Sequence, residues 1–325
     1  MATKPDFQDR IATILTRVGL TRNSYRVTPG LYGVGTPDQD SPVLVTANYK
    51  LSFDTLRFAL DGIDAWILVA DTRGINVWCA AGKGTFSSEE IINSVKETRL
   101  AERVTHHRLI VPQLGATGVS GLHVKKQSGF SVRFGPVRAS DLRPYLQDNY
   151  QADESMRSVT FKLQERLVLI PVEFYLVWKP LAYICVGAFL LSGISPSLFS
   201  ISAAWQRGLF AVAATLTGTL CGSIIVPIML PWLPGRHFWL KGLWPALLSG
   251  ILFVLLTLKQ FSPYEQMALV FWMTAVSSFQ AMNFTGCTPY TSPSGVEYEM
   301  RRGIGVQMTL AALGIVLWLV APFIG

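Results

Sequence analysis

The chain has 325 residues, of which 50% are apolar and 15% are charged, and its net charge is +7 at pH 7. Such a composition is too apolar for an ordinary soluble protein, and the length allows two domains. The positive charge does not indicate nucleic-acid binding, because the basic residues are scattered and form no run longer than Lys125-Lys126.

The apolar residues are concentrated in the second half of the chain. Up to about Arg166 the sequence is mixed and charge-rich, whereas long apolar runs with isolated charges follow. We therefore predict a soluble domain with a linker helix over residues 1–166 and a transmembrane domain over 167–325. The segment from Met1 to Asp6 has no apolar stretch behind a basic start, so we expect no cleaved secretion signal and a soluble domain in the cytoplasm.

Strand and helix patterns alternate along the soluble part. A Gly- and Pro-rich lead-in over 28–42 precedes the first buried strand. Ser87, with Glu90 three residues later, predicts a capping box at the start of a helix. The alternation favours a mostly parallel, Rossmann-like α/β sheet. The predicted elements, in chain order, are an amphipathic helix over 6–19, a strand over 43–46, a helix over 52–60, a strand over 66–70, the Ser87 helix, a strand over 108–112, a strand over 131–134 and a helix capped by Ser140.

An unpaired thiol, Cys79, lies in the segment Asn76–Lys83 that follows the second predicted strand. The carboxyl ends of strands are where ligands bind in open α/β sheets. The small residues of the segment allow its backbone to approach a large planar ligand closely. Lys83 and the start of the next helix favour the thiolate over the thiol. The alternative is that Cys79 is a small buried apolar residue, as most unpaired cysteines are.

Competing motifs are incomplete in this sequence. Gly33-Val34-Gly35 lacks the third glycine of a dinucleotide fingerprint, and Gly82-Lys83-Gly84-Thr85 lacks the upstream glycine of a P-loop. His106 and His107 are adjacent and point in different directions, so we expect no metal site there.

The cysteines are single and widely separated, which argues against a disulfide framework, a zinc site or an iron–sulfur cluster and suits a reducing compartment. We expect Cys185 and Cys221 to pack inside the membrane part. Cys287 is either an ordinary loop cysteine or a soft ligand that hands on a metal ion, since it falls in a predicted cytoplasmic loop from Thr285 to Arg301. The four cysteines are Cys79, Cys185, Cys221 and Cys287.

Five apolar stretches in the second half are long enough to cross a bilayer. Glu173 and Lys179-Pro180 interrupt the first stretch, so we expect it to be kinked or to begin with an interfacial helix. Flanking Lys and Arg are more frequent on the side of the soluble domain, which the positive-inside rule places in the cytoplasm. The predicted spans cover residues 167–192, 204–230, 242–258, 264–285 and 304–324.

The membrane part is predicted to be an anchor or assembly scaffold. We interpret Arg207 as a flanking charge at the edge of the second span and Glu173 and Lys179 as charges inside the first span, and two such charges are few for a transport path. Ala214, Gly218 and Gly222 form a stripe of small residues suited to close packing on a neighbouring helix.

The octapeptide from Asn76 to Lys83 resembles, at every position, the signature of the HgcA family, the corrinoid proteins of the microbial mercury-methylating pair. Three further features match that family: the strand end from Leu44 to Tyr49, the loop from Gln113 to Val119, and a polytopic membrane segment after the soluble domain. The soluble domain is also similar, more distantly, to the corrinoid-binding domain of the corrinoid iron–sulfur protein of the acetyl-CoA pathway.

The resemblance implies a cobalamin-type corrinoid with the Cys79 thiolate as the lower axial ligand of its cobalt. A coordinating thiol is deprotonated by its metal, and an electron-rich thiolate favours release of a cobalt-bound methyl group as a carbanion equivalent to Hg(II). Trp78 packs against the ring or the domain core, and Asn76 fixes the turn or contacts the corrin amides. The residues expected to bind the cofactor are Thr46, Asn48, Tyr49, Asn76, Val77, Trp78, Cys79, Ala80, Ala81, Gly82, Lys83, Gln113, Gly115, Ala116, Thr117 and Gly118.

The resemblance also implies partners and a location. A ferredoxin-like protein with two iron–sulfur clusters, of the HgcB type, would reduce the cobalt, and a folate-linked methyl group would be the donor. The chain would be a multi-pass methyltransferase of the cytoplasmic membrane that forms methylmercury. Two alternatives stay open: a membrane-bound corrinoid methyl carrier of one-carbon metabolism with another acceptor, and a non-enzymatic membrane transporter with a sensor domain.

Overall fold

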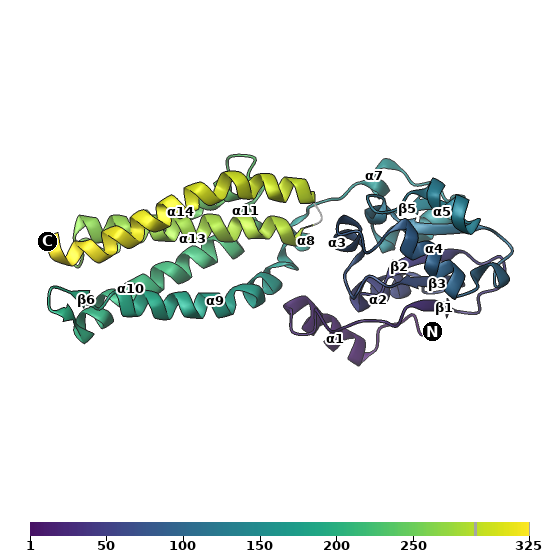
Figure 1. Ribbon diagram of the computed structural model, residues 1–325, viewed down its shortest axis with the longest axis horizontal. Helices are drawn as coiled ribbons and strands as arrows, with labels where there is room; N and C mark the ends of the chain where they lie inside the picture. Colours follow the sequence, from purple (N-terminus) through teal and green to yellow (C-terminus); the bar gives the residue numbers. More distant parts are fainter. Residues whose placement is uncertain (289–290, 325) are drawn as a thin grey trace. The chain divides into compact units, whose positions relative to one another are not determined.

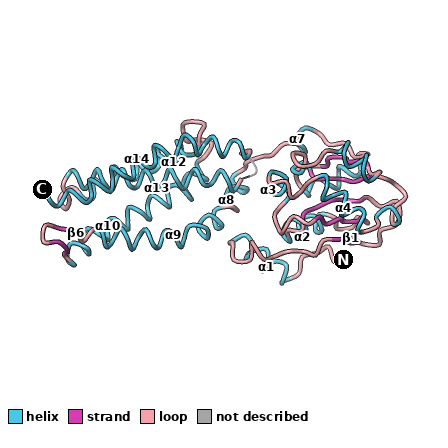
Figure 2. Tube along the Cα trace, viewed as in Figure 1, coloured by secondary structure: helices cyan, strands magenta, loops and turns pink. Residues whose placement is uncertain are grey.

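The chain divides into two compact units, Met1–Thr160 and Phe161–Gly325, in a computed structural model (Figure 1). The structure describes residues 1–288 and 291–324. The first unit mixes helices and strands, and the second is almost entirely helical (Figure 2). The helix expected to link the two domains, α8 (Leu163–Leu167), lies in the second unit.

A five-stranded sheet in the order β1-β3-β2-β4-β5 forms the centre of the first unit. Neighbouring strands from β3 to β5 are parallel, and β1 is antiparallel to β3 at one edge. The mostly parallel α/β sheet predicted from the sequence is therefore confirmed. The strands are β1 (Gly30–Val34), β2 (Val43–Ala47), β3 (Ala65–Ala70), β4 (Arg108–Pro112) and β5 (Ser131–Gly135).

Helices cover both faces of this sheet. Val43 and Val45 point to one face, where they pack with α3, α4 and α5, and Leu44 points to the other, where it packs with α2 and α6. Each face therefore has its own apolar core. The helices of this unit are α1 (Phe7–Val18), α2 (Lys50–Ala59), α3 (Val77–Gly82), α4 (Ser88–Glu97), α5 (Gly121–Ser128), α6 (Leu142–Gln147) and α7 (Glu154–Arg157), with short 3₁₀ turns η1 (Leu100–Glu102), η2 (Gln113–Gly115) and η3 (Ala139–Asp141).

Three features predicted from the local sequence differ in the structure: the lead-in over 28–42, the capping box at Ser87 and the cap at Ser140. The lead-in over 28–42 contains β1, whose partners in β3 are more than 30 residues away. Ser87 does cap α4, accepting from the Glu90 amide at 3.2 Å, but the Glu90 carboxylate does not complete the capping box. It accepts instead from the Asp71 amide at 2.9 Å, which ties α4 to the end of β3. Ser140 lies within η3 and does not cap α6.

The second unit is a bundle of long helices. α10 continues through a π-helical turn, η4 (Cys221–Ile225), into α11 (Val226–Met229), and a small hairpin of β6 (Ile194–Ser195) and β7 (Leu198–Phe199) joins α9 to α10. The remaining helices are α9 (Ile170–Leu191), α10 (Ile201–Leu220), α12 (Phe238–Thr257), α13 (Pro263–Cys287) and α14 (Pro293–Ile324).

Four stretches of the described chain are long and apolar enough to cross a bilayer: Leu163–Leu191, Ile201–Met229, Phe238–Thr257 and Ser294–Ile324. The predicted span over 264–285 is also helical, in α13, but it does not belong to these four. Polar residues of α13, among them Gln266, Ser277 and Gln280, are buried because α13 packs against α10, α12 and α14. Four of the five predicted spans therefore correspond to helices that are long and apolar enough to cross a bilayer, and the fifth corresponds to a more polar helix packed among the others.

The stripe of small residues packs on α13, as the sequence predicts. Ala214 is fully buried, and a Cβ atom on Gly218 would stand 2.7 Å from the Met273 carbonyl oxygen. A Cβ atom on Gly222 would meet the Ser277 carbonyl oxygen. Any larger side chain would force the two helices apart.

Two buried cations of the bundle, Arg207 and Lys241, have polar partners. Arg207, expected at a span's edge, lies inside α10 and bonds to Glu265 at 2.8 Å, and the Lys241 ammonium donates to the carbonyl oxygen of Leu233 at 2.8 Å. Cys287 is the last residue of α13, so the loop predicted to start at Thr285 is shorter than expected. Residues 289–290 of that loop lie outside the described residues.

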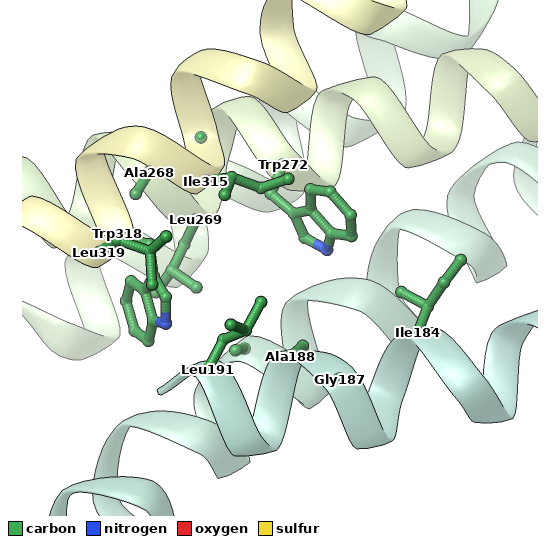
Figure 3. A pocket seen from close by; sticks show the side chains of 12 residues that line it. Ile184, Gly187, Ala188, Leu191, Ala268, Leu269, Trp272, Ile315, Trp318 and Leu319 are labelled. Atoms are coloured by element: carbon green, nitrogen blue, oxygen red, sulfur yellow. The ribbon is translucent and has the colours of Figure 1, made fainter. Parts of the chain in front are cut away.

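An apolar pocket of about 230 Å³ lies between α9, α10, α13 and α14 (Figure 3). Trp272 and Trp318 line it together with aliphatic residues and glycines, Ile184 and Leu191 among them. Such an apolar lining provides no ligand for a metal ion.

Candidate functional site

Three segments meet at the carboxyl edge of the parallel strands, which is where open α/β sheets bind ligands. Asn48 and Tyr49 follow β2, the loop that leads to Cys79 follows β3, and Gln113 follows β4. Because β2 pairs with both β3 and β4 in parallel, these segments leave the sheet side by side. α3, which carries Cys79, also packs against η2. The structure thus brings together the three segments singled out in the sequence.

The Cys79 segment is a helix of its own, not a loop between a strand and a helix. Asn76 caps α3 by accepting a hydrogen bond from the Cys79 amide at 2.9 Å. Val77, Ala80 and Ala81 face the core and are buried, whereas Trp78 and Cys79 are half-buried. The spacing of the buried residues fixes which side of α3 faces inward, and the thiol stays accessible at the sheet edge.

Asn48 anchors the loop between β3 and α3. Its side-chain oxygen accepts from the Thr72 amide at 3.1 Å, the Thr72 hydroxyl at 2.9 Å and the Gly74 amide at 2.8 Å. Its side-chain nitrogen donates to the Asp71 carboxylate at 2.9 Å. Asn48 is buried, and its side-chain oxygen is engaged in these three bonds to the loop. They hold the chain that leads to Cys79.

The anchoring partners Asp71 and Thr72 shape the candidate site through their bonds to Asn48 and were not expected from the sequence. The Thr72 hydroxyl also donates to the Ile75 carbonyl oxygen at 2.6 Å, and the Asp71 amide donates to Glu90 at 2.9 Å. Burial raises the pKa of Glu90, against the effect of that hydrogen bond. A signal existed in the sequence: two polar residues directly follow the buried strand β3.

Two buried polar atoms at this edge have no hydrogen-bond partner among the residues that the structure describes. They are the Tyr49 hydroxyl oxygen and the side-chain oxygen of Gln113. Burial raises the pKa of Tyr49, Arg22 and Arg17 act against this, and Cys79 adds to it. Tyr49 is thus within electrostatic reach of Cys79. Because buried polar groups are nearly always hydrogen-bonded, these two atoms are suited to a polar group from outside the chain.

The loop after β4 packs against α3 and the residues that follow it. A Cβ atom on Gly118 would meet the Phe86 carbonyl oxygen and stand 3.1 Å from the Ala81 Cα atom. A Cβ atom on Gly115 would stand 2.6 Å from the Phe86 ring. Both glycines are therefore required by close packing.

The other predicted site residues differ in exposure. Thr46 is buried within β2, Ala116 is half-buried and Thr117 is exposed. Gly82 and Lys83 are exposed at the end of α3. The side chains open to a ligand at this edge are therefore fewer than the predicted set.

Metal binding by this part of the chain would depend on Cys79 and an external group. The described residues contain no group of three or more His, Cys, Asp or Glu side chains that could hold an ion. The adjacent histidines are separately engaged: His106 bonds to the Ser41 carbonyl oxygen at 2.9 Å, and the ring of His107 lies 5.0 Å from that of Phe130.

Replacing Asn48 with alanine is expected to loosen the loop that carries Cys79. The change leaves Thr72 and Gly74 donors without their acceptor, which costs about 2 kcal/mol of local stability. Hydrogen exchange of the amides of residues 71–79 in the full chain measures this free energy. Asn93→Ala, at an exposed position of α4, is the matched control. Equal protection in the two variants would contradict the anchoring role.

Known proteins resemble the first unit. The family model of the CO dehydrogenase/acetyl-CoA synthase delta subunit matches residues 15–143. The gamma subunit of the acetyl-CoA decarbonylase/synthase complex of Methanopyrus kandleri is 36% identical over 128 residues, which are 39% of this chain and 27% of that protein. The same subunit of Archaeoglobus fulgidus is 30% identical over 135 residues, 41% of this chain and 28% of the relative.

A third relative, the gamma subunit of Methanocaldococcus jannaschii, is 33% identical over 131 residues, 40% of this chain and 26% of the relative. The chain thus spans about a quarter of the length of the curated relatives it matches. The similarity includes the segments around Asn48, Cys79 and Gln113, since all three lie within the family-model match.

Proposed function

We propose that the first unit binds a corrinoid at the carboxyl edge of its sheet and that the Cys79 thiolate ligates the cobalt. The relatives are gamma subunits of the acetyl-CoA decarbonylase/synthase complex. This supports the sequence resemblance of the soluble domain to the corrinoid-binding domain of a corrinoid iron–sulfur protein. The single observation that carries the proposal is that a half-buried cysteine, on a helix capped by Asn76, lies at the same sheet edge as two buried polar atoms that have no partner among the described residues.

The residues at the edge fit such a group. Tyr49 and Gln113 offer a hydroxyl and an amide to the polar substituents of a corrin ring. The close approach at Gly118 packs the loop after β4 directly against Ala81 of α3 and the Phe86 backbone, which holds the two segments of the proposed site together. Asn48 and Asn76 orient the segment, and Cys79 supplies a soft sulfur ligand. The remaining residues of the predicted cofactor-binding set stay part of the proposal.

A bound corrinoid would supply methyl-transfer chemistry, and a Cys79 thiolate ligand to its cobalt would favour release of the methyl group as a carbanion equivalent. The chain's contribution is to hold Cys79 deprotonated by coordination and to fix its position through the cap and the anchored loop. Lys83, exposed at the end of α3, adds a positive charge to the rim of the site. A carbanion equivalent requires an electrophilic acceptor.

We infer that the acceptor is Hg(II) and that the product is methylmercury. The octapeptide from Asn76 to Lys83 supports this through its resemblance to the mercury-methylating corrinoid proteins. A soft, electron-rich sulfur ligand such as the Cys79 thiolate would favour transfer of the methyl group to a soft electrophile. The chain would then be a corrinoid-dependent methyltransferase.

A second candidate function is that of a corrinoid methyl carrier in one-carbon metabolism. The names of the relatives favour it, because they belong to acetyl-CoA decarbonylase/synthase and none refers to mercury. In this case the methyl group would pass to a nucleophile. Both candidates share the corrinoid site, and they differ in the acceptor.

Partners and location follow from the same chemistry. Four dispersed cysteines do not suit an iron–sulfur cluster, so electrons for the cobalt would come from a ferredoxin-like partner with two such clusters. A folate-linked methyl group is the proposed donor. The four long apolar stretches support a multi-pass anchor in the cytoplasmic membrane, with residues 1–160 in the cytoplasm.

Product analysis separates the two candidates. The full chain in detergent is loaded with methylcobalamin and given either Hg(II) or a thiol nucleophile, and methylmercury and methyl thioether are quantified. Methylmercury formation above that of free methylcobalamin supports the first candidate. Transfer to the thiol alone supports the second. A chain that retains no corrinoid would contradict both and leave the transporter alternative.

A further inference from the structure

Helix α1 packs against its own domain through its polar side. Asp6 caps the helix by accepting from the Asp9 amide at 2.7 Å, and the Asp9 carboxylate pairs with Arg57 of α2 at 2.9 Å. Thr16 is fully buried and bonds to the Thr21 hydroxyl at 2.8 Å. Asp9 and Thr16 are seven residues apart and so share one face of the helix. The domain-facing side of α1 is therefore the side of these two residues.

The apolar side of α1 faces away from the domain. Phe7 is 76% exposed, Ile11 41% and Ile14 61%. Their spacing of four and three residues places them on a single stripe. In a surface helix of a water-soluble domain this stripe would face the core, so its exposure calls for an apolar environment outside the unit.

Positive charge borders this stripe. Arg10 and Arg17 are exposed and lie four residues before and three residues after Ile14, on one flank of the stripe. The nearest carboxylate on the opposite side, Asp9, is already paired with Arg57. An apolar stripe with a basic flank is the pattern of helices that lie in the surface of an anionic bilayer.

We propose that α1 lies on the anionic surface of the membrane, with Phe7, Ile11 and Ile14 inserted among the lipid headgroups. The inference rests on the proposed membrane anchor. The first unit ends at Thr160, and the first apolar stretch begins at Leu163, so a very short tether keeps the unit near the bilayer. Such a tether raises the effective concentration of the lipid surface around the unit, so that a helix as short as α1 is sufficient for binding to the membrane. The match to the family model begins at residue 15, after all three apolar residues.

Photo-crosslinking of the full chain in nanodiscs of phosphatidylethanolamine and phosphatidylglycerol tests the proposal. The variants Phe7→p-benzoylphenylalanine and Ile14→p-benzoylphenylalanine are expected to give lipid adducts. The same probe at Leu122, which is 81% exposed on α5, is the negative control, and at Leu252, 58% exposed on α12, the positive control. All these positions are exposed, so the probe does not disturb a core.

The outcomes distinguish a failure of the α1 proposal from a failure of the proposed membrane anchor. Lipid adducts at Leu252 but not at Phe7 or Ile14 would overturn the proposal and leave the anchor standing; adducts of α1 to peptides of this chain would do the same. An absence of lipid adducts at Leu252 would overturn the anchor and the inference with it.

The arginines give a second test of the lipid charge. In anionic nanodiscs, Arg10→Gln and Arg17→Gln are each expected to lower the adduct yield at Phe7 about fivefold, whereas Lys126→Gln on α5 leaves it unchanged. In nanodiscs of phosphatidylcholine alone the arginine substitutions have no such effect. Equal yields in both lipids for all variants would contradict the electrostatic part of the proposal.

Discussion

Cys79→Ala is expected to lower methylmercury formation by the corrinoid-loaded full chain by about two orders of magnitude or more. The substitution removes the sulfur that would donate electron density to cobalt, and the alanine side chain offers no ligand. Ala80 and Ala81 already pack in the core beside position 79, so α3 accommodates a small apolar residue without a change of fold. The effect is therefore one on chemistry and not on folding.

The other cysteines supply the matched controls. Cys185→Ala, at a half-buried position of α9, is expected to retain the wild-type rate because it lies in the second unit. Cys79→Ser tests whether a ligand of similar size but harder oxygen suffices, and we expect it to be as inactive as the alanine variant. Wild-type rates for both Cys79 variants would show that the thiol takes no part in the transfer.

Gly118→Val is expected to destabilise the site by about 3 kcal/mol, near the upper end for an overpacked core. A side chain at this position meets the Phe86 carbonyl oxygen and the Ala81 backbone at once, and neither belongs to a flexible side chain. The strain would push α3 away from the loop after β4 and move Cys79. The loss of hydrogen-exchange protection in α3 of the full chain measures this destabilisation.

Thr117, an exposed residue in the same loop, provides the control for Gly118→Val. Thr117→Val changes a surface residue one position away and should alter stability by less than about 0.5 kcal/mol. Corrinoid binding should fall in the Gly118 variant and stay unchanged in the Thr117 variant. Equal protection of α3 in the two variants would contradict the role of Gly118 in close packing.

The sequence predicts well what is specified locally. Buried strands β2, β3 and β4 follow from short apolar runs, and the Ser87 cap from a Ser–Glu spacing at the start of α4. The stripe at Ala214, Gly218 and Gly222 follows from the need of packed helices for small residues. In each case the signal lies within one element, where neighbouring residues determine the structure.

Features set by distant residues were not predictable in the same way. β1 contains two glycines and becomes a strand because β3 offers an edge to pair with. Glu90 turns to the Asp71 amide rather than to its own helix start. The helix α13 carries polar residues that are buried because neighbouring helices surround it, so its apolar residues alone did not distinguish it from the four more apolar stretches.

The site illustrates the same division. The octapeptide identifies Cys79 as the residue of interest, but the sequence does not reveal that Asn48 is used to hold the loop. Asn48 and Thr72 are 24 residues apart, and their contact depends on the parallel pairing of β2 and β3. The anchored loop is thus a property of the fold that supports the thiol.

The optical and EPR spectra of the full chain reconstituted with cobalamin test the central claim most directly. We predict spectra of sulfur-ligated cobalt for the wild type, and their loss in Cys79→Ala while the corrinoid stays bound. Coincident spectra of the two proteins would show that Cys79 is not a cobalt ligand. The proposed transfer of a carbanion equivalent would then lose its physical basis.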